Sequence, residues 1–176
     1  MRWRPASTLV LLVACASGPS PTPKRWEPEF PPELRETCSK APAECRQAAE
    51  KLAAAWISDE EAFGALKAFS AACAGGDAAA CAAVDTRFAR PRYLGDPPYP
   101  RYTQEALQKR VEGTWAATCS LSRTGQATGC TIELSLPVLD RHFLEWIRVG
   151  PWAPATLDGR PFACDYRFEF RLWISG

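Results

Sequence analysis

The chain lacks most of the groups on which enzyme active sites are built. Its 176 residues include a single histidine, His142, and contain neither an HExxH sequence nor a glycine-rich phosphate loop. The run of carboxylates at residues 59–61 fits the start of a helix, where negative charge is favourable, better than acid and base chemistry. We therefore predict that the protein is not an enzyme and that it binds no cofactor.

The chain also lacks an excess of charge and a long apolar run. Its 21 basic side chains are balanced by 20 acidic ones, so we expect no nucleic-acid partner. No stretch reaches the roughly 20 apolar residues that cross a bilayer. The short apolar run from Ala6 to Ala14, behind Arg2 and Arg4, has instead the size of the core of a secretory signal.

The end of this leader resembles the lipobox of bacterial lipoproteins. The residues Leu12-Val13-Ala14-Cys15 imply cleavage after Ala14 and acylation of Cys15. Ala16 and Ser17 follow, and the Asp that resembles an inner-membrane retention signal is absent. We therefore expect a lipid anchor that faces the periplasm, in the outer membrane rather than the inner one. An ordinary signal peptide with an incidental cysteine is the alternative.

The rest of the chain divides by composition. Residues 16–32 contain six prolines, which favour an extended and stiff spacer. Residues 36–90 are rich in alanine and favour helices. We predict four parts, namely a leader at 1–14, a proline-rich linker at 15–35, a helical segment at 36–90 and a C-terminal domain at 91–176.

Three helices are expected in the helical segment. The first covers residues 44–56, and the second begins after Ser58, which forms a capping box with Glu61. The second ends near Gly75-Gly76, and Asp77 caps a third that runs to about residue 89. The spacing from Cys73 to Cys81 resembles that of disulfide-bridged helical repeats related to tetratricopeptide arrays, and Cys38 to Cys45 is a weaker copy.

Cysteine spacing in this segment favours two local disulfides. Four cysteines allow three connectivities, and the short loops favour Cys38 with Cys45 and Cys73 with Cys81. A structural zinc would need closer spacing than C-x6-C and C-x7-C, so we expect no metal.

The C-terminal domain shows two alternating strands around residues 114–121 and 130–134. If the turn between them is centred on Thr124-Gly125, Cys119 lies opposite Cys130 within disulfide range. A longer loop would shift this register. Cys164 then remains as a buried thiol in the core of the same sheet.

A helix and a third strand complete the domain. Leu139, Phe143, Trp146 and Ile147 form an apolar stripe that would cover one face of the sheet. The last strand alternates from Phe162 to Leu172. Its outward residues are Asp165, Arg167, Glu169 and Arg171. A wholly antiparallel sheet requires strand order 2-1-3, which leaves the last strand at an edge. We therefore predict an α+β chain, a helical segment followed by a three-stranded antiparallel sheet with one packed helix.

The order of short signals in this domain resembles the C-terminal domain of the TonB energy-transducer family. The signals are Tyr99-Pro100, Glu112-Gly113, a strand, a turn at Gly125, a strand, Leu139-Asp140, the Pro154 to Pro161 segment with Gly159, and a final strand. The resemblance implies strand addition, in which an extended segment of an outer-membrane transporter pairs with the exposed edge.

Under this reading the four outward charges of the last strand would contact the peptide, although they could also simply guard the edge against aggregation. The chain departs from the family because a lipoprotein-like leader replaces the spanning N-terminal helix with its histidine. We therefore expect a membrane-anchored periplasmic adaptor for an envelope protein, without energy coupling. The alternative is a glycan-binding or structural envelope lipoprotein, but the tryptophans are scattered and no face is seen to collect them.

Overall fold

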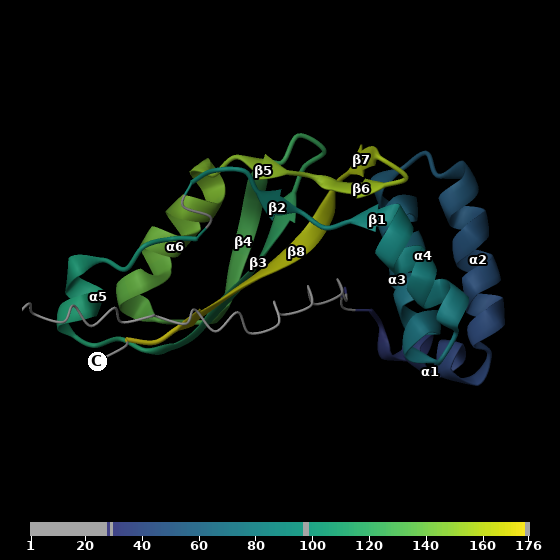
Figure 1. The fold of residues 1–176 in the computed structure, drawn as a ribbon, viewed down its shortest axis with the longest axis horizontal. Coiled ribbons are helices and arrows are strands. Elements are labelled where there is room, and N and C mark those ends of the chain that lie inside the picture. The colour runs from purple at the N-terminus through teal and green to yellow at the C-terminus, as the bar shows by residue number, and fades with distance from the viewer. Residues whose placement is uncertain (1–27, 29, 97–98, 175–176) are drawn as a thin grey trace, which may run out of the picture.

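The computed structural model describes residues 28, 30–96 and 99–174. Four helices form a helical module at one end of an elongated molecule, and a sheet with a packed helix forms the other end (Figure 1). The predicted α+β class is confirmed. None of the helices described is both long and apolar enough to span a bilayer.

The helical module consists of α1 (Pro32–Lys40), α2 (Pro42–Ala55), α3 (Asp59–Ala74) and α4 (Ala78–Arg87). The predicted capping box starts α3, because the Ser58 hydroxyl accepts from Glu61 N–H and the Glu61 carboxylate accepts from Ser58 N–H. Asp77 caps α4 by accepting from Ala80 N–H at 2.8 Å. The sequence did not indicate α1, which two prolines precede or open.

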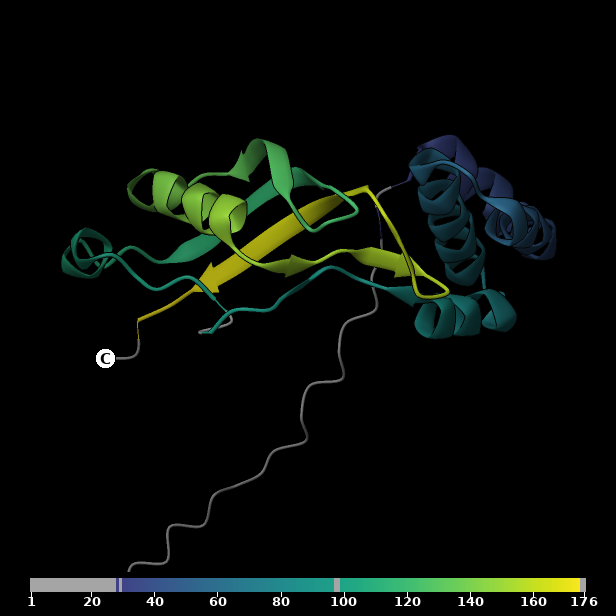
Figure 2. The ribbon, with the colours of Figure 1, turned by 90° about the horizontal axis from the view of Figure 1, so that it is seen from above.

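The sheet consists of β3 (Gly113–Leu121), β4 (Ala127–Leu134) and β8 (Cys164–Leu172) in the antiparallel order β4-β3-β8. This is the predicted order 2-1-3, and it is confirmed. Helix α6 (Pro137–Val149) packs on one face, and the short α5 (Gln104–Gln108) precedes β3 (Figure 2). No helix of the described residues covers the opposite face of the sheet, which is called the open face below.

The Leu139-Asp140 pair fixes α6 to the sheet. The Asp140 carboxylate accepts from Trp115 Nε1 at 2.9 Å and from Leu136 N–H at 3.0 Å. Leu139 is fully buried in the core between helix and sheet. Asp140 therefore accepts a hydrogen bond from a strand, and Leu139 fills the core. These two roles explain why the two residues occur together.

The β3–β4 hairpin departs from a simple register. In a regular antiparallel pair, the residue numbers of opposed residues have a constant sum. Near the turn Leu121 lies opposite Ala127, whereas farther along Thr118 lies opposite Thr131, which is one residue later than a regular register would give. An extra residue of β4 lies between these pairs, where Gly129 has a positive φ of 58°, and a second register shift lies between Ala116 and Ala117. The predicted proximity of Cys119 and Cys130 holds, but the alternation did not reveal these register shifts.

Five short strands that the sequence did not indicate form a connecting ribbon. β1 (Phe88–Ala89) pairs with β6 (Ala155–Leu157), which also pairs with β7 (Arg160–Phe162). β2 (Arg92–Tyr93) pairs with β5 (Trp152–Ala153). The predicted continuous last strand was wrong at Ala163, which lies between β7 and β8.

Two cores result. One lies between α6 and the sheet and contains Trp115, Phe143 and Phe168. The other belongs to the helical module but also contains Leu157, Phe162 and Cys164. Cys164 was therefore assigned to the wrong core, because Ala163 redirects the chain toward the helices. The predicted division between residues 90 and 91 stays a prediction, and the β1–β6 pairing crosses it.

Candidate functional site

Strand β8 leaves one edge without a partner in the described part of the chain. The direction of its backbone groups follows from the hairpin, in which Ser122 N–H donates to Gln126 O at 2.9 Å. Successive residues of a strand point their N–H and C=O groups to opposite edges, so the odd-numbered residues of β3 point toward β8. Because Cys119 pairs with Tyr166, the even-numbered residues of β8 bond to β3.

The odd-numbered residues of β8 therefore direct N–H and C=O toward the free edge. These are Asp165, Arg167, Glu169 and Arg171. Their side chains lie on the open face, so the same four residues carry both the backbone groups and the charges that an added strand would meet. An edge of this kind accepts another strand by main-chain hydrogen bonds.

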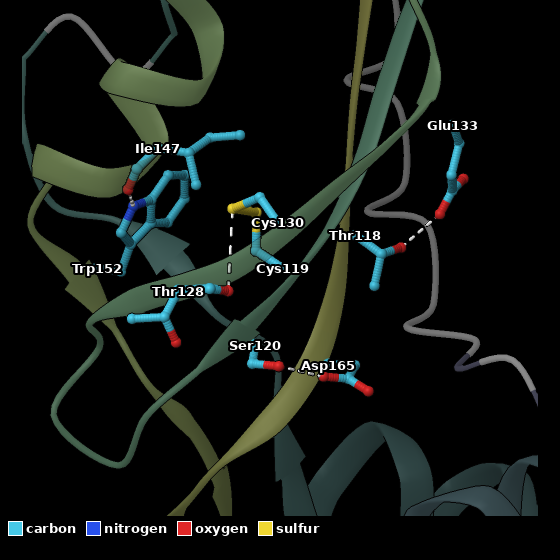
Figure 3. The surroundings of a disulfide bond; sticks show 9 residues. All are labelled: Thr118, Cys119, Ser120, Thr128, Cys130, Glu133, Ile147, Trp152 and Asp165. Carbon is cyan, nitrogen blue, oxygen red and sulfur yellow. Dashed lines mark hydrogen bonds between the residues drawn. A yellow bond between two sulfur atoms is a disulfide. The ribbon is translucent and has the colours of Figure 1, made fainter.

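The open-face charges are largely paired with one another. Arg167 Nε donates to Glu133 Oε2 on β4 at 2.6 Å, and Arg167 Nη1 donates to Glu169 Oε2. Thr118 Oγ1 donates to the other Glu133 oxygen at 2.5 Å. At the start of β8, Ser120 Oγ donates to Asp165 Oδ1 at 2.7 Å (Figure 3).

These contacts shift the pKa values of Glu133, Arg167 and Glu169. Hydrogen bonds from Thr118 and then Arg167 lower the pKa of Glu133, and those from Arg167 and Arg171 lower the pKa of Glu169. The pKa of Arg167 is raised, chiefly by Glu133 and Glu169. All three groups are therefore charged at neutral pH. Because they are partly exposed, they orient one another more than they stabilise the fold.

The opposite face of β8 is aromatic. Phe168 packs edge-to-face against Trp152 at 4.9 Å between ring centres, and Phe170 contacts Trp115 and Phe143. Burial raises the pKa of Tyr166 on the same face. This packing holds the edge strand in place, so the free edge is present before any partner binds.

The helical module fixes the start of β8. The Asp59 carboxylate at the start of α3 accepts from Ala163 N–H at 2.9 Å and from Arg123 Nε at 2.7 Å. Arg87 at the end of α4 donates to both Asp158 oxygens, at 3.0 and 2.7 Å. The end of the free edge that begins at Cys164 is thus held against the helices.

Comparison with known proteins identifies a family model that is similar to part of this chain. The family model of the Gram-negative bacterial TonB protein C-terminal matches residues 98–172. Residues 98–172 are therefore similar to a TonB C-terminal domain. A solution NMR structure of the Pseudomonas aeruginosa TonB C-terminal domain is similar at 19% identity and a TM-score of 0.41, over 50% of this chain and 90% of that one. No curated protein matches the chain.

The structure forms the three predicted disulfides, two of them expected from cysteine spacing and one from the strand register. Cys38 pairs with Cys45, Cys73 with Cys81, and Cys119 with Cys130, the last within the segment that matches the family model. Figure 3 shows this last disulfide on the Trp152 side of the sheet, away from the Thr118–Glu133 pair. Cys164 remains a thiol, and burial raises its pKa to about 12.

The lipidation site, the single histidine and potential metal ligands were also considered in the sequence. Cys15 lies outside the described residues, so its acylation stays a prediction. His142 on α6 is half-buried, and its Nε2 has no hydrogen-bond partner. No group of three or more potential metal ligands occurs among the residues that the structure describes.

One residue near the edge was missed by sequence reasoning. Trp173 follows β8 and is 69% exposed. The alternation of the last strand continues past Leu172, so Trp173 falls at an outward position like Arg171. An apolar side chain at an outward position of an edge strand was the signal that could have identified it.

Proposed function

We propose that this protein is a lipid-anchored periplasmic adaptor that binds an extended peptide of an envelope protein along the free edge of β8. Outer-membrane transporters are the first candidates for that envelope protein, because residues 98–172 match the TonB C-terminal family model. Binding adds a strand to the sheet through main-chain hydrogen bonds. Transport is not driven by this chain alone.

The observation that carries this proposal is the outward direction of the backbone N–H and C=O groups at the odd-numbered residues from Asp165 to Arg171. The edge strand is held by an aromatic core on one face and by the helical module at its start. A preformed edge costs less entropy on binding than one that must first be ordered. The paired charges of Asp165, Arg167 and Glu169 add little attraction of their own, so along this part of the edge binding relies mainly on the backbone.

The anchor in this proposal is Cys15, behind the lipobox-like residues Leu12-Val13-Ala14. The proline-rich linker would hold the folded part away from the membrane surface. Replacing Cys15 with Ser should release the protein into the soluble periplasmic fraction. Retention of the Cys15→Ser protein in the membrane fraction would rule out the lipid anchor but would leave the binding edge untouched.

The binding edge is tested with the full chain, since Phe162 is buried in the core of the helical module and residues 91–176 alone would expose it. Synthetic N-terminal peptides of transporters from the same envelope are titrated into the wild type, Arg167→Pro and Arg167→Ala. Proline removes an outward N–H and clashes with an added strand, whereas alanine keeps the backbone.

We expect Arg167→Pro to lose about tenfold or more in affinity and Arg167→Ala to lose about twofold. Both variants must first show the wild-type circular dichroism spectrum. Equal affinity of the two variants for a peptide that binds the wild type would exclude this edge as the site.

A further inference from the structure

Trp173 is exposed beside the free edge and has no ring partner among the described residues. Its side chain is 69% exposed. The stacked and edge-to-face contacts of the α6 core involve other rings, with Phe170 the last ring of β8 to take part. A large apolar side chain that the fold does not use is typical of a contact surface.

The backbone around Trp173 is nevertheless held. Ile174 N–H donates to Glu112 Oε1 at 2.8 Å, and Leu172 pairs with Gly113 at the start of β3. Trp173 therefore lies between two residues whose backbone is held, Leu172 by strand pairing and Ile174 by a hydrogen bond. A rigid aromatic side chain on a fixed backbone loses little entropy when a partner covers it.

Of the outward charges, Arg171 is the one left most available. Its side chain is 72% exposed, and its one hydrogen bond within the described residues runs from Nε to Glu169 Oε1 at 3.1 Å. Arg167 instead contacts two carboxylates, and Asp165 accepts from Ser120. The C-terminal end of the edge thus offers an apolar ring and a guanidinium that still has free donors.

We propose that Trp173 and Arg171 select the peptide that the edge binds. The peptide carries a large apolar side chain beside Trp173 and a carboxylate two positions away, beside Arg171. Residues two apart in an added strand lie on one face, so a single peptide can meet both. Tryptophan and arginine are the side chains most often found to dominate binding energy. This proposal rests on the proposed edge binding.

The test is a selection from random peptides displayed on phage, with the full chain as bait and the Arg167→Pro variant used to remove peptides that ignore the edge. We expect the surviving sequences to share an apolar and an acidic residue two positions apart. Repeating the selection on Arg171→Glu should replace the acidic residue with Lys or Arg. An unchanged acidic residue on Arg171→Glu would overturn the role of Arg171.

A selected peptide is then synthesised and titrated. Trp173→Ala should weaken its binding about tenfold, as for a residue that dominates an interface. The control is Ile57→Ala, which removes an 84% exposed apolar side chain from the helical module and should change nothing. Equal loss for the two variants, or no loss for Trp173→Ala, would contradict the proposal.

The outcomes separate the two proposals. If no peptide distinguishes the wild type from Arg167→Pro, the edge itself is not a binding site. If peptides depend on the edge but lack the spaced pair and tolerate Trp173→Ala, the edge stands and the selection by Trp173 and Arg171 falls. Binding to phosphatidylglycerol vesicles that is lost in Trp173→Ala would assign the residue to a lipid surface and also overturn the proposal.

Discussion

The Asp59 carboxylate accepts a hydrogen bond from Ala163 N–H at 2.9 Å, across 104 positions of the sequence. This contact joins the first turn of α3 to the residue that separates β7 from β8. It places the start of the free edge against the helical module. The helical module and the sheet are therefore joined by a hydrogen bond at this point.

Replacing Asp59 with Ala should lower the free energy of unfolding by about 1 to 2 kcal/mol. The change leaves Ala163 N–H without its acceptor and removes the ion pair with Arg123. Urea unfolding measures the loss. The control is Glu60→Ala at the exposed neighbouring position, and an equal loss in both variants would show that the effect is helix N-terminal charge alone.

Gly125→Ala should destabilise the protein more than Gly159→Ala. The backbone φ is 79° at Gly125 and 78° at Gly159, so alanine at either position would adopt a left-handed conformation, which costs about 1 kcal/mol. A Cβ at Gly125 would also lie 1.9 Å from Trp152 O, whereas Gly159 faces open space. Thermal unfolding should show a clearly larger loss for Gly125→Ala. Similar losses would mean that the turn can move away from β5.

Cys164 should resist alkylation in the folded protein. Its thiol is buried, and its pKa of about 12 leaves almost no thiolate at pH 8. Iodoacetamide labelling followed by peptide mapping should modify Cys164 only after denaturation. The same map should show the disulfides 38 with 45, 73 with 81, and 119 with 130. A bridge from Cys164 to Cys119 or Cys130 would contradict the fold.

The Glu133 contacts predict a pH dependence of stability. The pKa of Glu133 is lowered below its ordinary value of 4.5, so its contribution is present above that value and is lost as pH falls through the folded pKa. Wild type should therefore be more stable than Glu133→Gln at pH 7, and the difference should shrink in acid. Urea midpoints at both pH values measure it. A difference that grows in acid would contradict the Arg167 and Thr118 contacts.

The sheet and its helix were accessible to sequence reasoning because their signals are local and periodic. The stripe predicted for α6 contained Leu139, Phe143, Trp146 and Ile147. Three of these residues are fully buried, and Trp146 is partly buried against the same core. Alternation of Phe168 and Arg167 distinguished the two faces of the last strand. Strand order then followed from the requirement for antiparallel pairing.

The ribbon between the two ends of the molecule could not be predicted in this way. Its strands are two or three residues long, too short to show a period, and the β1–β6 and β2–β5 pairs join segments that are far apart in sequence. The contact of Asp59 with Ala163 has no local signal at all. The bulge at Gly129 could not be predicted for a related reason. One extra residue leaves the alternation of apolar and polar residues on either side of it unchanged.

Amide hydrogen exchange along β8 tests the binding edge most directly. In the free protein, the N–H groups of Asp165, Arg167 and Glu169 should exchange quickly and those of Tyr166 and Phe168 slowly, since only the latter bond to β3. Adding a peptide that binds should slow the odd-numbered amides by at least about tenfold and leave the even-numbered ones unchanged. Odd-numbered amides that stay fast in the complex would show that the peptide binds elsewhere.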